Sequence, residues 1–192
     1  MDRPIDIDTP FIETTRTNLV VLPPEKAQLM LDYYSLNREH LSAWEPTRND
    51  SFYSLEHWQR QLAENVNQFE NGSALKLVAL DKASQEVIAV CNFTNIVRGI
   101  FQACNLGYSV SARYQGQAYM HEVLQAALAY VFNELGLHRV MANYMTSNQR
   151  SAALLEQLGF EQEGFAKSYL KIAGRWQDHV LTAKINPAHS LR

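Results

Sequence analysis

The strongest chemical signal in the chain lies in a short loop of six residues, Arg113, Tyr114, Gln115, Gly116, Gln117 and Ala118. The loop separates a strand-like apolar run at 103–110 from a long run of helical periodicity. A strand that enters a helix through a tight loop points several backbone N–H groups at one place, and the helix dipole favours an anion there. Gly116 and Ala118 let a ligand approach the backbone closely. The loop predicts a site for an anion such as pyrophosphate, although Arg-x-x-Gly-x-Ala alone fits a plain strand–helix turn equally well.

Two familiar nucleotide-binding loops do not match these residues. A P-loop needs Gly-Lys-Ser/Thr to hold phosphates and Mg²⁺, and the chain contains no such sequence. A Rossmann loop needs three spaced glycines, whereas only Gly116 is present here. No histidine pair has metal-ligand spacing, so we expect a phosphate ligand held without a metal.

A second segment, Asn148 to Phe160, reads Asn-Gln-Arg-Ser-Ala-Ala-Leu-Leu-Glu-Gln-Leu-Gly-Phe. A purely structural role explains much of it, because Asn148 suits a helix N-cap and Gly159 a helix C-cap. Taken together, and in this order along the chain, the two segments nevertheless resemble the GNAT acetyltransferases. In that family an R/Q-x-x-G-x-G/A loop binds the coenzyme A pyrophosphate, and N-x-x-S-x-x-L-L-x-x-x-G-F lies along the pantetheine arm. The resemblance implies acetyl-CoA as cofactor, with coenzyme A as product and no metal.

The resemblance extends to one branch of the family, the bacterial ribosomal-protein-alanine N-acetyltransferases, from about residue 14 to residue 182. It rests on residues 41–46 (Leu-Ser-Ala-Trp-Glu-Pro), 90–95 with 97–99, 106–109 (Leu-Gly-Tyr-Ser), 138–145 and 174–180 (Gly-Arg-Trp-Gln-Asp-His-Val). It implies transfer of the acetyl group to the N-terminal α-amino group of a ribosomal protein that begins with alanine, by direct attack in a ternary complex. The implied partner is that ribosomal protein or the ribosome.

The same resemblance assigns residues to the cofactor. The strand that ends at Val110 is expected to splay from its neighbour, and its backbone to polarise the thioester and pair with the pantetheine. Asn148 and Ser151 have a helix-capping role as the alternative. The expected cofactor-binding residues are Tyr108, Ser109, Val110, Arg113, Gln115, Gly116, Gln117, Ala118, Tyr119, Met120, Asn143, Asn148 and Ser151.

The expected catalytic residues are Ser151, Asn105 and Tyr108. Ser151 matches a serine that protonates the departing thiolate in related ribosomal enzymes. Asn105 stands where many relatives carry a glutamate base, but an amide cannot take a proton. Glu161 and Glu163 lie near another relative's glutamate, although their run also fits an exposed strand start.

The chemistry of the acceptor decides how much a missing base matters. An α-amino group has a pKa of about 7.7–8.0, so roughly one in seven is neutral at pH 7, against about one in 2,500 for a lysine. An α-amine substrate can therefore rely on a water relay. Candidate substrate-binding residues, for each of which a core, capping or turn role is an open alternative, are Trp44, Glu45, Asn92 and Asp178.

The elements that position these residues follow from hydrophobic periodicity. Strands are expected at 16–22, 74–80, 87–93, 103–110 and 139–145, with two more that turn at Ala173-Gly174; helices are expected near 27–34, 54–69, 120–135 and 149–158. This order lacks regular βαβ alternation, which argues against a doubly wound dinucleotide fold. We expect one mixed α/β (α+β) domain over residues 1–192, with its core at about 14–185. The resemblance implies a mostly antiparallel twisted sheet of about seven strands flanked by about four helices.

The bulk composition bears on partners and compartment. With 17 basic and 20 acidic side chains the net charge is −3, so no strong basic field favours sequence-specific nucleic-acid binding. No apolar run approaches the ~18 residues of a membrane span, and the N-terminus lacks the features of a signal peptide. Cys91 and Cys104 lie in apolar runs and are expected to be buried thiols. We expect a cytoplasmic protein, without membrane contact, that is a monomer or weak homodimer.

Two other functions stay open at this point. GNAT folds change acceptors through their N-terminal helices, so the acceptor is alternatively a small amine such as a polyamine, an antibiotic or an amino acid. A non-catalytic ribosome-binding or regulatory protein that keeps a cofactor pocket is the other alternative. Turnover on a panel of amines separates these possibilities.

Overall fold

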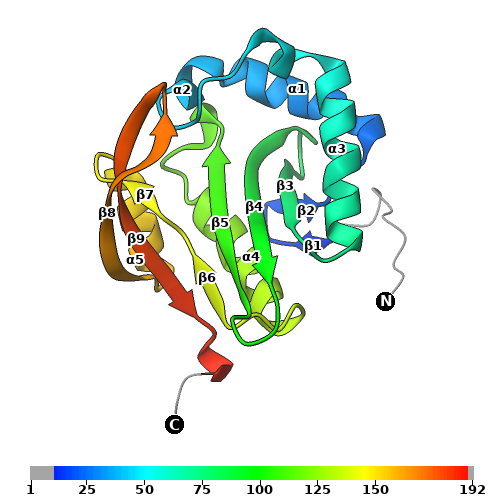
Figure 1. The fold of residues 1–192 in the computed structure, drawn as a ribbon. Helices are drawn as coiled ribbons and strands as arrows, with labels where there is room; N and C mark the ends of the chain where they lie inside the picture. Colours follow the sequence, from blue (N-terminus) through cyan, green and yellow to red (C-terminus); the bar gives the residue numbers. More distant parts are fainter. Residues whose placement is uncertain (1–10, 190–192) are drawn as a thin grey trace.

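The computed structural model describes residues 11–189, and its centre is a nine-stranded sheet (Figure 1). Across the sheet the strand order is β1-β2-β3-β4-β5-β6-β9-β7, and β8 also pairs with β9. Every pairing of the described strands is antiparallel except that of β5 with β6. The strands are β1 (Ile12–Glu13), β2 (Thr17–Val20), β3 (Leu75–Asp81), β4 (Val87–Val97), β5 (Ala103–Val110), β6 (Arg139–Met141), β7 (Tyr144–Met145), β8 (Glu161–Ile172) and β9 (Arg175–Ile185).

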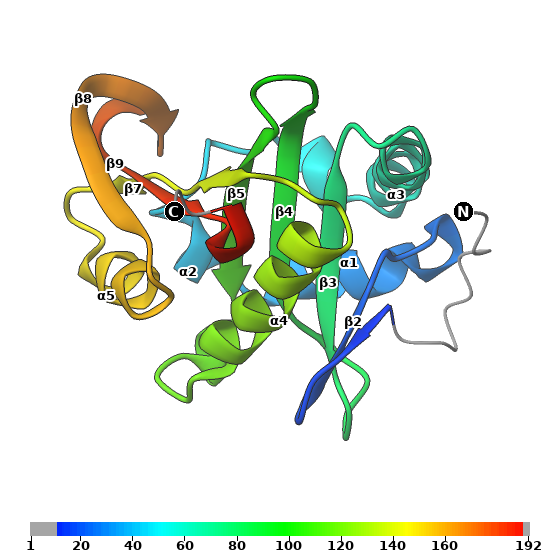
Figure 2. The same ribbon diagram turned by 90° about the horizontal axis from the view of Figure 1, so that it is seen from below.

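Helices cover both faces of the sheet, as the view from below shows (Figure 2). Because successive strand residues point to opposite faces, neighbours in β3 enter different cores. Leu77 packs in the core that contains Leu124 of α4, whereas Val78 packs in the core that contains Leu62 of α3. The helices are α1 (Ala27–Leu36), α2 (Arg38–Ser42), α3 (Leu55–Glu70), α4 (Tyr119–Asn133) and α5 (Gln149–Gln157).

The predicted mixed α/β fold with a mostly antiparallel sheet is confirmed, with a few more elements than expected. The expected strand at 139–145 is divided into β6 and β7. At the break, Asn143 Oδ1 accepts from the Thr182 N–H and the Thr182 hydroxyl donates to the Ala142 carbonyl, so these two backbone groups do not bond each other and the regular ladder is interrupted. The short β1 and α2 carry too few residues to show a periodicity of their own.

The β8–β9 hairpin turns at Ala173-Gly174, as predicted. Both residues have positive φ, 47° and 77°, which is the backbone of the turns that match strand twist in tight hairpins. The Ala173 N–H donates to the Glu45 carbonyl at 3.0 Å. This bond ties the hairpin tip to the segment that follows α2.

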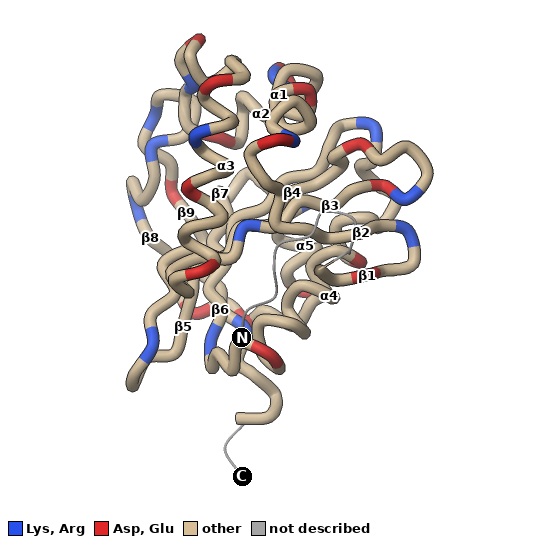
Figure 3. The backbone as a smooth tube through the Cα atoms, turned by 90° about the vertical axis from the view of Figure 1, so that its right-hand side faces the viewer, with Lys and Arg blue, Asp and Glu red and all other residues tan. Residues whose placement is uncertain are grey.

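Lys and Arg residues are interspersed with Asp and Glu residues along the backbone in Figure 3. Within residues 11–189, no helix is long and apolar enough to cross a membrane. Cys91 and Cys104 are both free and buried, as expected, and burial raises the pKa of each thiol to about 12.

Candidate active site

The strands β5 and β6 separate halfway along β5. Their parallel pairing covers Ala103–Asn105 with Arg139–Met141, and beyond it β4 is the one described strand that pairs with β5. Residues 107–110 are exposed or half-buried, whereas Ala103 and Cys104 are buried. A free strand edge offers N–H and C=O groups to an extended ligand. The expected splay at the end of this strand is therefore present in the backbone.

The loop after β5 presents a cluster of unpaired backbone donors. Gly116 (φ 71°) and Ala118 (φ 61°) both take left-handed conformations, and Ala118 is the N-cap of α4. Among residues 11–189, no acceptor is found for the N–H groups of 116–121, while the Glu122 N–H donates to the Ala118 carbonyl. Six free donors at a helix N-terminus suit an anion with several oxygens, which is what a pyrophosphate offers.

Arg16, in the turn before β2, contacts this loop and helps to hold its conformation. Its NH1 donates to the Gln117 carbonyl at 2.9 Å, and its guanidinium lies 3.8 Å from the centre of the Tyr119 ring. Its backbone N–H and Nε donate to the two carboxylate oxygens of Glu122 at 2.8 and 2.7 Å. Burial alone would raise the pKa of Glu122, but the bonds from Arg16 and Thr14 and the charge of Arg16 outweigh it and lower the pKa.

The side chains of the predicted loop residues take different directions. Gln115 joins two helices, because its Nε2 lies 3.0 Å from His40 Nε2 and its Oε1 accepts from Arg150 NH1 at 2.5 Å. Arg113 is largely exposed and lies 3.8 Å from Glu86. Met120 is buried in the core next to α4. For Met120, the backbone is therefore the part open to a ligand.

A short hydrogen bond joins β5 to the first turn of α5. The Tyr108 hydroxyl lies 2.5 Å from Ser151 Oγ. The Ser151 N–H donates to Asn148 Oδ1 at 3.1 Å, so Asn148 does cap the helix. Burial raises the pKa of Tyr108 to about 12, against the opposing effect of the Ser151 bond. The hydroxyl pair is thus protonated over the whole physiological range.

Two other predicted residues hold strands together. Asn143 Oδ1 accepts from the Thr182 N–H at 3.2 Å, and its Nδ2 donates to the Tyr169 hydroxyl at 3.3 Å. Asp178 Oδ1 accepts from the Ser168 N–H at 2.8 Å, where the β8–β9 register shifts. Asn143 and Asp178 therefore both fix the strands beside the splay.

A different set of residues shares the face that α1 and α3 cover. Residues that are directly paired across strands point to the same face, and the pairs here are Asn92 with Gly107, Thr94 with Asn105, and Val90 with Ser109. Tyr33 of α1 reaches this face, since its hydroxyl lies 2.9 Å from Ser109 Oγ. Because Tyr108 alternates with Ser109, its side chain points to the opposite face, where it packs against the α4 core.

Glu45 is the predicted substrate residue with the most unusual surroundings. Its carboxylate lies 3.3 Å from Arg48, and burial nevertheless raises its pKa. Its charge adds to the burial that raises the pKa of the Tyr33 and Tyr34 phenols, and the Tyr33 hydroxyl lies 2.9 Å from Ser109 Oγ. Trp44 beside it is 39% exposed.

The two glutamates considered for the base are remote from Asn105. Asn105 pairs with Met141, Met141 with Ala183, and Ala183 with Glu161. Glu161 is therefore three strand spacings away from Asn105, which corresponds to about 14 Å. Glu163 forms an ion pair with Arg139. Within the described part of the chain, no group of three or more His, Cys, Asp or Glu side chains is arranged to hold a metal ion.

Sequence reasoning missed Arg16, His40 and Arg150. The three residues come from the turn before β2, from α2 and from α5, and they meet the loop only through the tertiary fold. No motif marks them, since a lone Arg or His is usually a surface residue.

The chain is similar in sequence and in fold to several known proteins. The acetyltransferase (GNAT) domain family matches residues 18–161. The [ribosomal protein uS5]-alanine N-acetyltransferase of Escherichia coli strain K12 is 45% identical over 183 residues, or 94% of each chain. The structure of ribosomal-protein-S5-alanine acetyltransferase from Vibrio fischeri has a TM-score of 0.88 and 36% identity, covering 91% of this chain and 96% of that one.

A more distant structure shares the same fold. RimJ of Mycobacterium smegmatis, solved in complex with CoA-disulfide, has a TM-score of 0.86 at 23% identity, covering 94% of this chain and 89% of that one. The match to the family spans most of the strands and helices that build the splay and the loop. The chain belongs to the GNAT acetyltransferase family.

Proposed function

We propose that this protein transfers the acetyl group of acetyl-CoA to the N-terminal α-amino group of alanine on ribosomal protein uS5. The proposal is supported by the Escherichia coli relative, which has this activity in its name and aligns over 94% of both chains. The observation that carries the chemistry is the cluster of unpaired N–H groups at 116–121 beside the free edge of β5. We take residues 14–185 as one catalytic domain that acts in the cytoplasm as a monomer or weak homodimer.

The donor site follows from backbone groups. Acetyl-CoA supplies the acetyl group as a reactive thioester. The N–H groups of 116–121 bind its pyrophosphate, and the free edge of β5 pairs with the pantetheine amides. The backbone at Val110 polarises the thioester carbonyl, because a fixed donor stabilises developing negative charge. Gly116 fits this role, since its φ of 71° favours glycine and a Cβ built there would meet no atom of the described residues within 4 Å, which leaves the space beside its backbone open.

Ser151 and Tyr108 serve the departing thiolate. Ser151 Oγ donates a proton to the sulfur and regains one from solvent, and the Tyr108 hydroxyl, 2.5 Å away, hydrogen-bonds the serine oxygen during the transfer. With a pKa of about 12, Tyr108 keeps its own proton and acts as a neutral donor. Neither cysteine takes part, because both are buried and have a pKa of about 12.

The acceptor amine binds on the face of Ser109 and Asn105. Glu45 is the carboxylate on that side, and its raised pKa makes it a stronger proton acceptor than an exposed glutamate. It holds the α-amine and takes its proton directly or through water. Asn105 orients the amine by hydrogen bonding and moves no proton.

The test is mass spectrometry of ribosomal proteins from cells with and without this chain. Loss of one N-terminal acetyl group, on uS5 alone, is the expected result. A purified-enzyme panel compares Ala-initiated peptides, peptides with a blocked α-amine, and small amines. Acetylation only of lysine side chains or small amines contradicts the proposal, and coenzyme A binding without any turnover indicates the non-catalytic alternative.

A further inference from the structure

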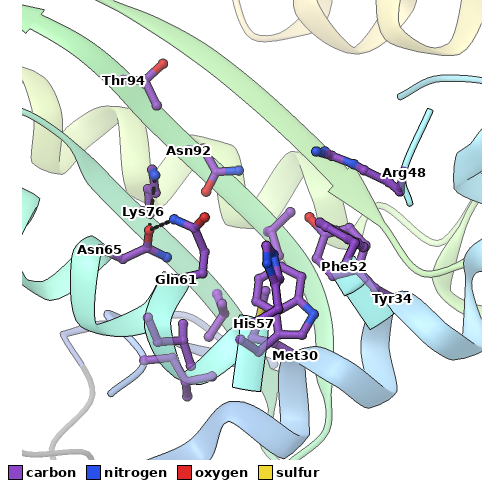
Figure 4. A pocket seen from close by; sticks show the side chains of 15 residues that line it. Met30, Tyr34, Arg48, Phe52, His57, Gln61, Asn65, Lys76, Asn92 and Thr94 are labelled. Carbon is purple, nitrogen blue, oxygen red and sulfur yellow. Dashed lines mark hydrogen bonds between the residues drawn. The ribbon is translucent and has the colours of Figure 1, made fainter. Parts of the chain in front are cut away.

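A cavity of about 290 Å³ lies between the sheet and helix α3, next to the acceptor face (Figure 4). Its apolar wall includes Tyr34 and Trp58, whose rings stack with centres 4.8 Å apart. Its polar lining comes from both strands and helix: Lys76 of β3, Asn92 of β4 and Gln61 and Asn65 of α3 point toward one another in the figure. The cavity therefore combines an apolar wall with one polar end.

The polar end carries the ammonium group of Lys76, which forms no ion pair among the described residues. Lys76 Nζ donates to Asn65 Oδ1 at 3.0 Å, and Gln61 Nε2 donates to the same oxygen at 2.9 Å. Within residues 11–189, no carboxylate lies at ion-pair distance from Lys76, and no Asp or Glu lines the cavity. Burial lowers the pKa of Lys76, while the charge of Glu64 opposes the change. A half-buried ammonium paired only with a neutral amide favours an incoming anion.

An open row across the sheet connects this ammonium to the splay. Lys76 pairs with Asn92, and Asn92 pairs with Gly107, so the three residues share one face. Two strand spacings place Lys76 about 10 Å from Gly107. A Cβ built on Gly107 would meet no atom of residues 11–189 within 4 Å, so the space directly above Gly107 is open. Gly107 has no positive φ that would require glycine.

We propose that this cavity is a specificity site for the acceptor, in which Lys76 binds a side-chain carboxylate of the third or fourth residue of the peptide. The inference rests on the proposed function, which places the α-amine at the splay. An extended peptide rises about 3.3 Å per residue, so three or four residues span the open row. Asn92 and Gln61 offer further amide donors to the same carboxylate or to the peptide backbone.

The other cationic side chains at the cavity are less available. Arg48 is already paired with Glu45 at 3.3 Å. For His57, burial and then the charges of Arg60 and Arg48 lower the pKa, so the ring is neutral at pH 7. Lys76 is therefore the charged group that distinguishes between acceptor peptides, and it favours an acidic peptide residue over a basic one.

The test compares Ala-initiated peptides of one length that carry a single Glu at position 2, 3, 4 or 5 with their Gln counterparts. We expect the wild-type protein to prefer Glu over Gln at position 3 or 4 by about tenfold in kcat/KM, mainly through KM. Lys76→Met and Lys76→Gln should bring this ratio close to one. The control Lys26→Met removes an exposed charge elsewhere and should keep the ratio.

Failure of the proposed function and failure of the carboxylate site give different experimental results. If no Ala-initiated peptide is acetylated at all, the proposed function fails. If the peptides are acetylated but the wild type shows no Glu preference, or Lys76→Met keeps that preference, the carboxylate site is wrong. Coenzyme A binding by calorimetry reports that each variant is folded. Succinate added with the Gln peptides tests a free carboxylate as occupant, and activation by succinate overturns the assignment to a peptide side chain.

Discussion

Arg16 Nε lies 2.7 Å from Glu122 Oε2, and this ion pair joins the turn before β2 to the first turn of α4. The two residues are 106 positions apart in the chain. Because Arg16 also bonds the Gln117 carbonyl, the contact fixes the loop whose N–H groups face the proposed pyrophosphate. The geometry of the loop therefore depends on a residue outside it.

Arg16→Met should weaken donor binding. Without the contacts of Arg16 the loop is less well ordered, so we expect KM for acetyl-CoA to rise about tenfold. We expect the free energy of unfolding to fall by about 1–2 kcal/mol. Steady-state kinetics and urea unfolding measure the two effects. The matched control is Arg139→Met, which removes the ion pair with Glu163 beside Ala103, at the end of β5 away from the loop. An unchanged KM for acetyl-CoA in Arg16→Met would contradict the claim that Arg16 holds the loop in its binding conformation.

The Arg16–Glu122 ion pair also makes the stability of the fold depend on pH. The folded pKa of Glu122 lies below its ordinary value of 4.5, so its stabilisation is present above that value and is lost as the pH falls through the folded pKa. We expect wild-type stability to decline more steeply than that of Glu122→Gln below pH 4.5. Equal slopes in acid unfolding curves would argue against the contribution of Glu122.

Ala118→Gly and Gly116→Ala should have opposite effects on stability. Ala118 has φ 61°, a conformation that costs an L-residue about 1–2 kcal/mol, so glycine there relieves strain. Gly116→Ala adds strain of the same kind at φ 71° and places a methyl group in the space for the ligand. We expect a higher Tm for the first variant, and for the second a lower Tm with an increased Kd for coenzyme A in calorimetry.

Ser151→Ala should lower kcat by about a hundredfold with little change in KM, since a positioned proton donor contributes about 10²–10⁴ to rate. Tyr108→Phe should lower kcat less, because it removes only the bond to Ser151. With a Tyr108 pKa of about 12, wild type and Tyr108→Phe should show the same pH–rate profile between pH 6 and 10. A basic limb that disappears in Tyr108→Phe would contradict this role.

Glu45→Gln should separate activity from stability. The folded pKa of Glu45 is raised, so its favourable contribution exists at pH below 4.5 and is lost as the pH rises through the folded pKa; at pH 7 the buried charge costs free energy. We expect the variant to be slightly more stable at pH 7 but to have a lower kcat. Urea unfolding and peptide kinetics at pH 7 test both, and unchanged kcat would remove Glu45 from the proton path.

The parts of the candidate site whose backbone structure could be predicted from the sequence are local. The loop at 113–118 and the segment at 148–160 each combine a backbone conformation with its capping residues, and both are encoded within a few positions. The turn at Ala173-Gly174 was predictable for the same reason.

The parts that the sequence did not predict depend on pairing between distant segments. Arg16 reaches the loop only through the packing of the turn before β2 against α4. Lys76, Asn92 and Gly107 form a row only in the register of three antiparallel strands. The division of 139–145 follows from contacts with Thr182 of β9, which no local periodicity reports.

The two buried thiols make the chain a convenient background for site-specific labelling. Cys91 and Cys104 are shielded and almost fully protonated near neutral pH, so maleimide reagents should leave the native protein unmodified. A single cysteine introduced at an exposed position such as Lys26 would then carry a fluorophore without prior removal of the natural ones. The same shielding protects both sulfurs from mixed disulfides with free coenzyme A.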